Sequence, residues 1–396
     1  MLLINIAHNL CIFFGICFAG NIIVQKFLKG KIWNTIEEKF CFEFIIGFIL
    51  ISFSLYVITL FNFFIIELLI FINLILIIFS VIYILKKKID IKIFFNSYNY
   101  LLFLIILTLF ISTFLPITDA DTIAYHLEIP QKIIENKRLS FNYIDYHEIF
   151  YGPGEAIYLL GIIFKNYNLP QFFNFIALII LFLIVKTLFE FKNYISKSLL
   201  IFGIMSSPVL FQLFLSGKPQ LIFISINIFL FSMLYNFSKK RLYYNKNLFV
   251  FFVILIFISL TIVLAKITFI FTSFAIILYF LFIYKEIFKF KPFYIIIVST
   301  FFLCLIIFNQ KYNIYGTQSL YFVPSILFDF DSNFINFLEK IKLSNNYKFF
   351  PLNLFTPLSK STLLDTLGYI SIFFVFLFFY FKNNNAKERI LIFLLV

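Results

Sequence analysis

Residues 248–284 read LFVFFVILIFISLTIVLAKITFIFTSFAIILYFLFIY, and this apolar run decides the class of fold. As a single helix it would be about 55 Å long, at 1.5 Å per residue, whereas the hydrocarbon core of a bilayer is about 30 Å thick. Basic residues flank both ends of the run, which is typical of cytoplasmic loops. The run therefore predicts two membrane-spanning helices joined by a turn at residues 265–268, with Lys266 at the outer surface.

The composition of the whole chain agrees with this interpretation. Of the 396 residues, 62% are hydrophobic and 13% are charged, and the mean hydropathy is +1.02. Soluble domains are about half apolar and a quarter charged, so the composition excludes a water-soluble globular protein, a disordered chain and a disulfide scaffold. The four cysteines lie in apolar runs without a CxxC pair, which argues against disulfides and against a zinc site.

Eleven apolar runs in the sequence are long enough to cross a membrane as helices of about 20 residues. They are residues 2–24, 41–61, 64–85, 100–118, 171–190, 198–215, 219–237, 248–265, 267–284, 293–309 and 363–381. The first run has no basic segment before it, so we expect a retained helix and not a cleaved signal. A shorter piece, 154–164, either lies along the interface or re-enters. Residues 390–396 are predicted to begin a truncated twelfth helix, and the alternative is that they lie in the interface.

The basic residues divide the connecting loops into two sets. Short loops on one side hold 21 of the 32 lysines and arginines, and these loops alternate strictly with loops poor in basic residues. By the positive-inside rule the rich loops are cytoplasmic, so the two long loops, 119–155 and 310–362, face outward. The net charge of +13 therefore reflects membrane topology and not nucleic-acid binding. We predict one all-α polytopic membrane domain, 1–396, with about eleven spans and with juxtamembrane helices on its outward loops.

The first outward loop concentrates the titratable groups of the chain. It holds His126 and His147, which are two of the three histidines, together with seven acidic residues. The acidic residues are Asp119, Asp121, Glu128, Glu135, Asp145, Glu148 and Glu155. A polar, acid-rich loop is where chemistry is expected if the protein is an enzyme, so we take 119–155 as the first catalytic loop. The loop 310–362 is predicted to be a lid or an acceptor platform.

The segment DADTIAYHLEIP, residues 119–130, carries a pair of carboxylates, Asp119 and Asp121. In a helix that begins near Asp121, the side chains of Asp121, Tyr125 and Glu128 share one face. The carboxylate pair allows three roles: a helix cap, a ligand pair for a divalent cation, or a general base toward a hydroxyl group. His126 either orients a carboxylate or faces a neighbouring helix.

Three basic residues on the outward side suit a substrate that carries a phosphate leaving group. Arg138 is the only arginine there, Lys218 lies in the short turn SGKP at 216–219, and Lys266 lies in the turn at 265–268. Each has a simpler alternative. Arg138 then contacts lipid headgroups, Lys218 is an isolated turn residue, and Lys266 marks the turn and snorkels to the surface.

These segments resemble the GT-C superfamily of membrane glycosyltransferases, which includes protein O-mannosyltransferases and the aminoarabinose transferase that decorates lipid A. The resemblance rests on DTIAYHL at 121–127, YGPGE at 151–155 and the lysine-containing turn AKIT at 265–268. It rests also on the aromatic–proline segment FFPLN at 349–353, which precedes DTLG at 365–368 and the last span.

The resemblance implies an enzyme that moves a sugar from a polyprenyl-phosphate carrier to a glycan, lipid or protein acceptor on the outer face, with inversion of the anomeric carbon. It implies an aspartate as general base, with Asp121 as first choice and Asp119 as second. If the enzyme needs Mg²⁺ or Mn²⁺, these two residues would be the ligands. The location implied is a bacterial inner membrane, with the site facing the periplasm. The residues implied at the donor and its phosphate are Arg138, Lys218, Lys266, Tyr125 and His126.

Other functions compete with this interpretation. A polysaccharide polymerase or O-antigen-ligase-like enzyme would be expected to depend on outer-loop arginines, and only Arg138 is available. A transporter or flippase would show paired half-domains and charges at mid-membrane. The sequence has no internal repeat. Glu43 and Glu67, which lie within predicted spans, are expected either to face the bundle interior or to be neutral, and the alternative is that they mark a transport path. A non-catalytic scaffold would leave the acidic loop without a purpose.

Overall fold

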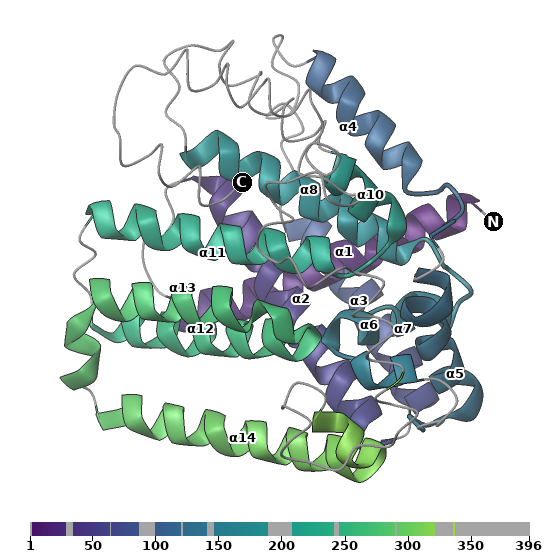
Figure 1. Cartoon of the computed structure of the whole chain (residues 1–396). Helices are drawn as coiled ribbons and strands as arrows, with labels where there is room; N and C mark the ends of the chain where they lie inside the picture. The colour runs from purple at the N-terminus through teal and green to yellow at the C-terminus, as the bar shows by residue number, and fades with distance from the viewer. Residues whose placement is uncertain are drawn as a thin grey trace, which may run out of the picture.

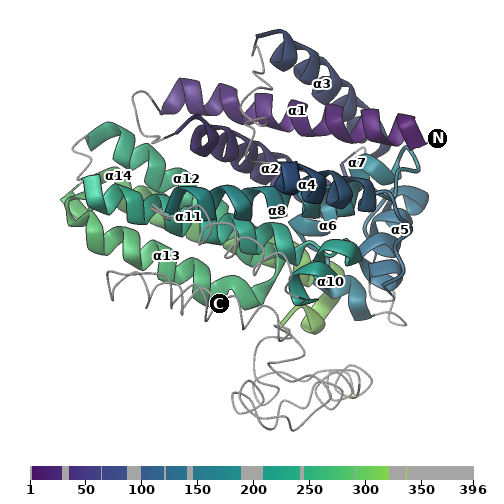
Figure 2. The same cartoon turned by 90° about the horizontal axis from the view of Figure 1, so that it is seen from above.

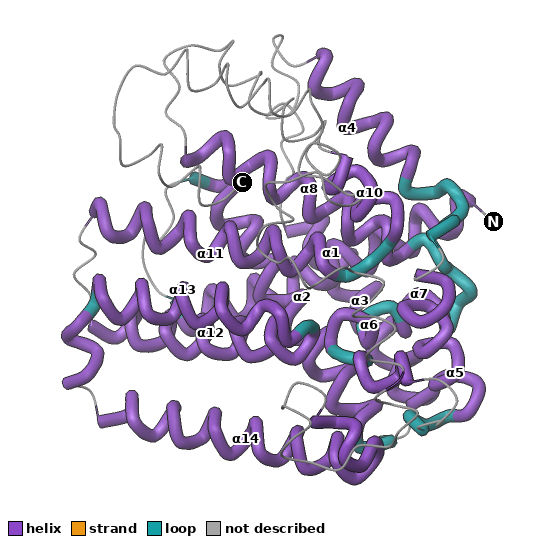
Figure 3. The backbone as a smooth tube through the Cα atoms, in the orientation of Figure 1, coloured by secondary structure: helices purple, strands orange, loops and turns teal. Residues whose placement is uncertain are grey.

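The computed structural model of the chain describes residues 2–28, 35–63, 65–86, 100–119, 122–140, 146–188, 208–240, 245–289, 291–320 and 336. Every regular element among these residues is a helix, so the predicted all-α fold is confirmed for them (Figures 1 and 3). The predicted helices at 363–381 and 390–396, and most of the loop 310–362, lie outside the described residues.

Five of the described helices are long and apolar enough to cross a membrane. They are α1 (Leu2–Phe27), α2 (Ile36–Leu60), α3 (Ile65–Lys86), α12 (Asn245–Ala265) and α14 (Lys291–Tyr315). Five further helices complete the bundle: α4 (Tyr100–Ser112), α8 (Leu169–Leu188), α10 (Pro208–Ser216), α11 (Gln220–Lys240) and α13 (Ile270–Ile283). In Figure 1, the axes of α11, α12, α13 and α14 lie across the view roughly parallel to one another.

The turn predicted within the apolar run 248–284 is confirmed. α12 ends at Ala265, Lys266 follows in an extended conformation, and the short helix η4 (Ile267–Phe269) leads into α13. Lys266 is the one charged residue in this run, and its side chain is exposed. The chain therefore reverses at this lysine.

One end of the bundle, which we call the site end, collects most of the short helices. They are η2 (Thr122–Leu127), α5 (Glu128–Asn136), η3 (Tyr146–Phe150), α6 (Pro153–Ala156) and α7 (Leu159–Ile162). Figures 1 and 2 show α5, α6 and α7 together at this end, near the N-terminus of α1. η6 (Gly316–Leu320) follows α14 here, and η5 (Lys285–Lys289) connects α13 to α14 at the opposite end. The side-chain amide of Gln310 on α14 donates to the carbonyl of Leu60, the last residue of α2, over 3.1 Å.

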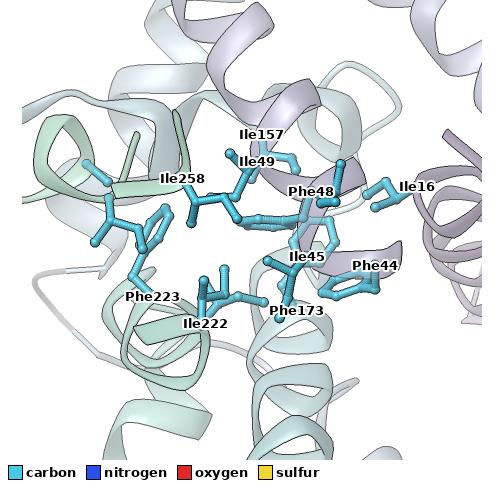
Figure 4. Close-up of a cluster of buried hydrophobic side chains, with 14 of the residues drawn as sticks. Ile16, Phe44, Ile45, Phe48, Ile49, Ile157, Phe173, Ile222, Phe223 and Ile258 are labelled. Carbon is cyan, nitrogen blue, oxygen red and sulfur yellow. The ribbon is translucent and has the colours of Figure 1, made fainter. Parts of the chain in front are cut away.

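A core of aromatic and aliphatic side chains fills the space between the helices (Figure 4). Phe48 of α2 packs edge-on against Phe173 of α8, with ring centroids 5.2 Å apart, and Phe223 of α11 lies 6.1 Å from Phe48. Ile157, which follows α6, is fully buried in the same cluster. α6 and α7 are thus packed inside the protein, which fits either alternative for the piece 154–164.

Two glycines set the separation of α1 and α2. A Cβ atom on Gly20 would lie 1.7 Å from the carbonyl oxygen of Glu43, and one on Gly47 would lie 2.0 Å from the carbonyl oxygen of Ile16. Real Cβ atoms do not approach backbone atoms so closely, so the two helices cross where neither has a side chain. The missing side chains let the backbones meet, which is the usual role of small residues between membrane helices.

The two acidic residues within the first spans behave differently. Glu43 is fully buried, and its carboxylate accepts hydrogen bonds from Asn21 of α1 (2.6 Å) and Tyr83 of α3 (3.3 Å). The prediction that it faces the bundle interior is confirmed. The same prediction is wrong for Glu67, which is exposed because α3 begins only two residues before it, at the end of the helix and not at mid-membrane.

Candidate functional site

The chain leaves α4 and enters the acidic loop through Asp119. The Oδ2 atom of Asp119 accepts hydrogen bonds from the backbone N–H of Thr122 (2.9 Å) and from its hydroxyl group (2.7 Å). Asp119 therefore caps η2, which is one of the three roles that the sequence left open for it. Asp121, the other member of the pair, lies outside the described residues.

The first turn after Asp119 is not an α-helix. η2 is a π-helix, in which the hydrogen bonds span five residues instead of four. The α-helical spacing that placed Asp121, Tyr125 and Glu128 on one face therefore does not apply to this turn. Tyr125 is half-buried and Glu128 is exposed, and their common face with Asp121 stays a prediction, since Asp121 lies outside the described residues.

Lys218 reaches Asp119 from a turn that is distant in the sequence. The turn at 216–219 joins α10 to α11, and Gly217 has a φ of +72°, a conformation that favours glycine. The Nζ atom of Lys218 lies 3.2 Å from Oδ2 of Asp119, and the exposed fractions of the two side chains are 15% and 21%. Two residues that the sequence offered as separate candidates thus form one partly buried ion pair.

The surroundings of Asp119 decide its protonation. Burial alone would raise the pKa of this carboxyl group, but the hydrogen bonds from Thr122 and the charge of Lys218 outweigh burial and hold the pKa below its ordinary value of 3.8. A carboxylate with three donors on one oxygen and a lowered pKa is a weak proton acceptor. The geometry therefore favours Asp119 as the residue that positions Lys218, and not as the general base.

We expect the Asp119–Lys218 pair to stabilise the fold at neutral pH and to lose this effect in acid. Because the folded-state pKa is lowered, the stabilisation is present above the ordinary value of 3.8 and is lost as the pH falls through the folded-state pKa. The unfolding temperature of Asp119→Asn should lie about 1–3 °C below that of the wild type at neutral pH. This difference should shrink in acid below 3.8. Glu135→Gln, at an exposed position of α5, is the control, and a pH-independent difference for Asp119→Asn would contradict the ion pair.

His126, in the same short helix η2, forms a buried pair with the carboxylate of Glu155 in α6. His126 Nδ1 and Glu155 Oε1 are 2.8 Å apart, and the exposed fractions of the side chains are 2% and 3%. The other carboxylate oxygen of Glu155 accepts the backbone N–H of Gly152 over 3.1 Å. Of the two alternatives for His126, contact with a carboxylate is confirmed, and that carboxylate is Glu155. The Nε2 atom of His126 is buried and has no hydrogen-bond partner in the described part of the chain.

The segment 151–155 brings separate turns together. A Cβ atom on Gly154 would lie 2.7 Å from the ring of Pro219, in the turn that carries Lys218. A Cβ atom on Gly152 would lie 2.6 Å from the carbonyl oxygen of Leu264, beside the turn that carries Lys266. Glycine at both positions lets the segment fit between the two turns. The segment 151–155 therefore packs against the turns at 216–219 and 265–268, and through His126 it meets η2 as well.

Two buried tyrosines fasten this segment to the bundle. The hydroxyl of Tyr151 lies 3.0 Å from the hydroxyl of Thr59 on α2, and the hydroxyl of Tyr158 donates to the carbonyl of Gly217 over 2.8 Å. Burial raises the pKa of both phenols, and the charge of Glu155 adds to the effect. Both hydroxyls therefore stay protonated at neutral pH and serve as structural hydrogen-bonding groups.

The sequence reasoning missed two basic residues at the site end. Lys132 on α5 forms ion pairs with Glu128 at 2.9 Å and with the buried Glu148 at 3.5 Å. Its i, i+4 spacing from Glu128 was a usable signal. Lys311, near the end of α14, lies 5.7 Å from the ring centroid of Tyr56 and attracts the carboxylate of Glu155. No local pattern marks Lys311, because its partners come from other helices.

The other two predicted phosphate ligands, Arg138 and Lys266, have exposed side chains. Arg138 follows α5, a helix about 12 Å long that separates it from η2 along the chain. The next residue, Leu139, donates its backbone N–H to the side-chain oxygen of Asn62, in the turn after α2. Lys266 is exposed, and its turn contacts the segment 151–155. Lys266 thus lies at the edge of the site, whereas Arg138 lies near the turn after α2.

Tyr125, predicted at the donor, stacks on His147 with ring centroids 5.4 Å apart and an interplanar angle of 13°. It lies against the ring of His126 as well, at 3.8 Å. Within the described ranges, no group of three or more histidine, cysteine or acidic side chains is arranged to hold a metal ion.

These observations define a helical membrane protein in which buried polar side chains and ion pairs gather at one end of the bundle. The chain belongs to the DUF1420 N-terminal domain family, which matches residues 76–396. The match begins within α3, so Asp119, His126, Glu155, Lys218 and Lys266 all lie inside the family domain. No characterised protein and no solved structure matches the chain.

Proposed function

We propose that the protein is a membrane glycosyltransferase that moves a sugar from a polyprenyl-phosphate carrier to a glycan, lipid or protein acceptor and inverts the anomeric carbon. The proposal includes about eleven spans and a site end that faces outward. It includes a location in a bacterial inner membrane, where the site would meet the periplasm.

The observation that carries the proposal is that η2 connects two pairs of side chains. The Asp119–Lys218 ion pair lies at its start, and the buried His126–Glu155 pair lies near its end. A lysine that a carboxylate holds in a short turn is a preorganised partner for a phosphate oxygen. At the end of a membrane bundle such a lysine lies at headgroup level, where the phosphate of a polyprenyl carrier lies. The imidazole and the carboxylates supply the proton-accepting groups that transfer to a hydroxyl requires.

The reaction forms one bond and breaks one bond. The acceptor oxygen attacks the anomeric carbon, and the bond from that carbon to the phosphate oxygen breaks, so that polyprenyl phosphate leaves with the bonding electrons. Lys218, and Lys266 at the edge of the site, offset the charge that develops on the phosphate. A side chain of the segment 119–126 takes the hydroxyl proton, and Asp121 is the carboxylate that the sequence favours. Asp119 and Asp121 stay the proposed ligands of Mg²⁺ or Mn²⁺ if the reaction uses one.

The full-length protein, purified into lipid nanodiscs, provides the test. It should transfer label from radiolabelled undecaprenyl-phosphate hexoses or pentoses to acceptors in membranes from cells that lack the gene. The expected result is a labelled glycan, lipid or protein that forms only when the protein is added. If none of these undecaprenyl-phosphate sugars gives a labelled product, the proposed function is wrong.

The same preparation separates the alternatives. A polymerase or O-antigen-ligase-like enzyme would use an undecaprenyl-diphosphate oligosaccharide and ignore the monophosphate donors. Since Arg138 is the only arginine of the two predicted outward loops, we do not expect this outcome. A flippase would move the labelled lipid across the membrane of a sealed vesicle without consuming it. Chromatography of the recovered lipid distinguishes this movement from transfer of the sugar.

A further inference from the structure

We propose that His126, oriented by Glu155, is the general base of this reaction, and that Glu155 is its positioning residue. The inference rests on the proposed function, because it names the group that takes the proton of the acceptor hydroxyl. It differs from the expectation that an aspartate of the pair 119 and 121 has this role.

The first argument is the orientation of the imidazole. Glu155 uses both carboxylate oxygens: Oε1 faces His126 Nδ1 at 2.8 Å, and Oε2 accepts the N–H of Gly152 at 3.1 Å. An ionised carboxylate can only accept hydrogen bonds, so the hydrogen of the neutral imidazole lies on Nδ1. The lone pair is then on Nε2, and a carboxylate fixed at both oxygens holds the ring in this orientation.

The second argument is the unused Nε2 atom. It is buried, and no described residue offers it a hydrogen bond. Buried polar atoms are almost always hydrogen-bonded in folded proteins, so the lone pair of Nε2, which no described residue uses, is available to a further group. A substrate hydroxyl fits an acceptor nitrogen of this kind.

The third argument is that three other described groups near the ion pair, one carboxylate and two phenols, are unsuited to the role. Asp119 already accepts three hydrogen bonds on Oδ2, from Thr122 and Lys218. Tyr151 and Tyr158 are fully buried and already hydrogen-bonded to Thr59 and Gly217. His126 lies in η2, the short helix that Asp119 caps. One helix thus links the proton acceptor to the lysine that faces the leaving phosphate.

The proton transfer completes the reaction given above. As the acceptor oxygen bonds to the anomeric carbon, its proton moves to Nε2, and the electrons of the broken sugar–oxygen bond leave on the phosphate. His126 becomes an imidazolium ion, which the negative charge of Glu155 stabilises. The proton returns to solvent after the product leaves, so charge and atoms balance over one turnover.

Glu155→Gln tests the arrangement with an isosteric change. The N–H of Gly152 requires an oxygen, so the new amide must turn its NH₂ group toward His126. Nδ1 then has to accept, the hydrogen moves to Nε2, and the base is lost. We expect kcat to fall about 10³–10⁴-fold with KM nearly unchanged, as for a histidine base in the wrong tautomer. The kcat of His126→Gln should fall by a similar factor, and the control Glu135→Gln should keep the wild-type kcat.

A second measurement needs no substrate. The chain has only three histidines, so nitrogen NMR of histidine-labelled protein gives few signals, and His126→Gln assigns the one of interest. At a pH where the ring is neutral, the wild type should show Nε2 without hydrogen and Glu155→Gln should show Nε2 with hydrogen. A wild-type ring that carries its hydrogen on Nε2 overturns the inference.

The outcomes keep this inference apart from the proposed function. If His126→Gln and Glu155→Gln retain transfer while Asp121→Asn abolishes it, Asp121 is the base, the inference is wrong and the glycosyltransferase stands. If the wild type itself transfers no sugar from any undecaprenyl-phosphate donor, the proposed function fails, whatever the tautomer of His126.

Discussion

Replacing Lys218 with methionine should lower the rate of sugar transfer by about 10²–10³-fold, the loss typical of one removed charge-stabilising group. Methionine keeps an unbranched side chain of similar length and removes the ammonium group that lies 3.2 Å from Asp119. The hydrogen bonds from Thr122 to Asp119 persist in this variant, so the cap of η2 and the fold should survive. The measurement is the initial rate of label transfer from an undecaprenyl-phosphate sugar in nanodiscs.

Two further variants test whether the loss of activity is caused by removing the positive charge at position 218, and not by removing any lysine at this end of the bundle. Lys165→Met removes an exposed lysine between α7 and α8, at the same end of the bundle, and should leave the rate unchanged. Lys218→Arg keeps the charge and should recover part of the activity. Full activity in Lys218→Met, or an equal loss in Lys165→Met, would remove Lys218 from the reaction.

Replacing Gly20 with leucine should abolish the correctly folded protein. The first carbon of the new side chain would lie 1.7 Å from the carbonyl oxygen of Glu43, a backbone atom within α2 that cannot turn aside. Overpacking costs about 1–3 kcal/mol where side chains can adjust, and here the helices themselves must separate. Separation also breaks the hydrogen bonds of Glu43 with Asn21 and Tyr83, at 2.6 Å and 3.3 Å. Because net stabilities are about 5–15 kcal/mol, little monodisperse protein should remain on size-exclusion chromatography.

The matched control adds the same bulk elsewhere on α1. Ala7 is exposed on this helix, so Ala7→Leu should give normal yield and a normal unfolding temperature. Gly47→Leu should repeat the Gly20→Leu result from the other side of the crossing, since its Cβ would lie 2.0 Å from the carbonyl oxygen of Ile16. A monodisperse Gly20→Leu protein with wild-type stability would show that α1 and α2 do not cross as described.

The sequence predicted several residues of the candidate site, but it did not predict which of these residues contact one another. Local sequence indicated Asp119 as a helix cap and Lys218 as a turn lysine, and the structure has both. It did not indicate that the two residues pair, nor that His126 meets Glu155. The grouping of Arg138 with the phosphate ligands followed from its charge and loop alone, and α5 separates it from η2 along the chain. The π-turn of η2 was missed because nothing in DTIAYHL distinguishes it from an α-helical start.

The sequence by itself determined the helical membrane class and the reversal at 265–268. Hydropathy, helix length and the position of basic residues are local properties, and they decide which segments fit the hydrocarbon core of a bilayer. Only the tertiary structure decided that α6 and α7 are buried, that Lys218 holds to Asp119 and that Glu155 orients His126. These contacts join residues far apart in the chain. Their distances depend on how closely helices approach at positions such as Gly20, Gly152 and Gly154, which no periodicity within one segment encodes.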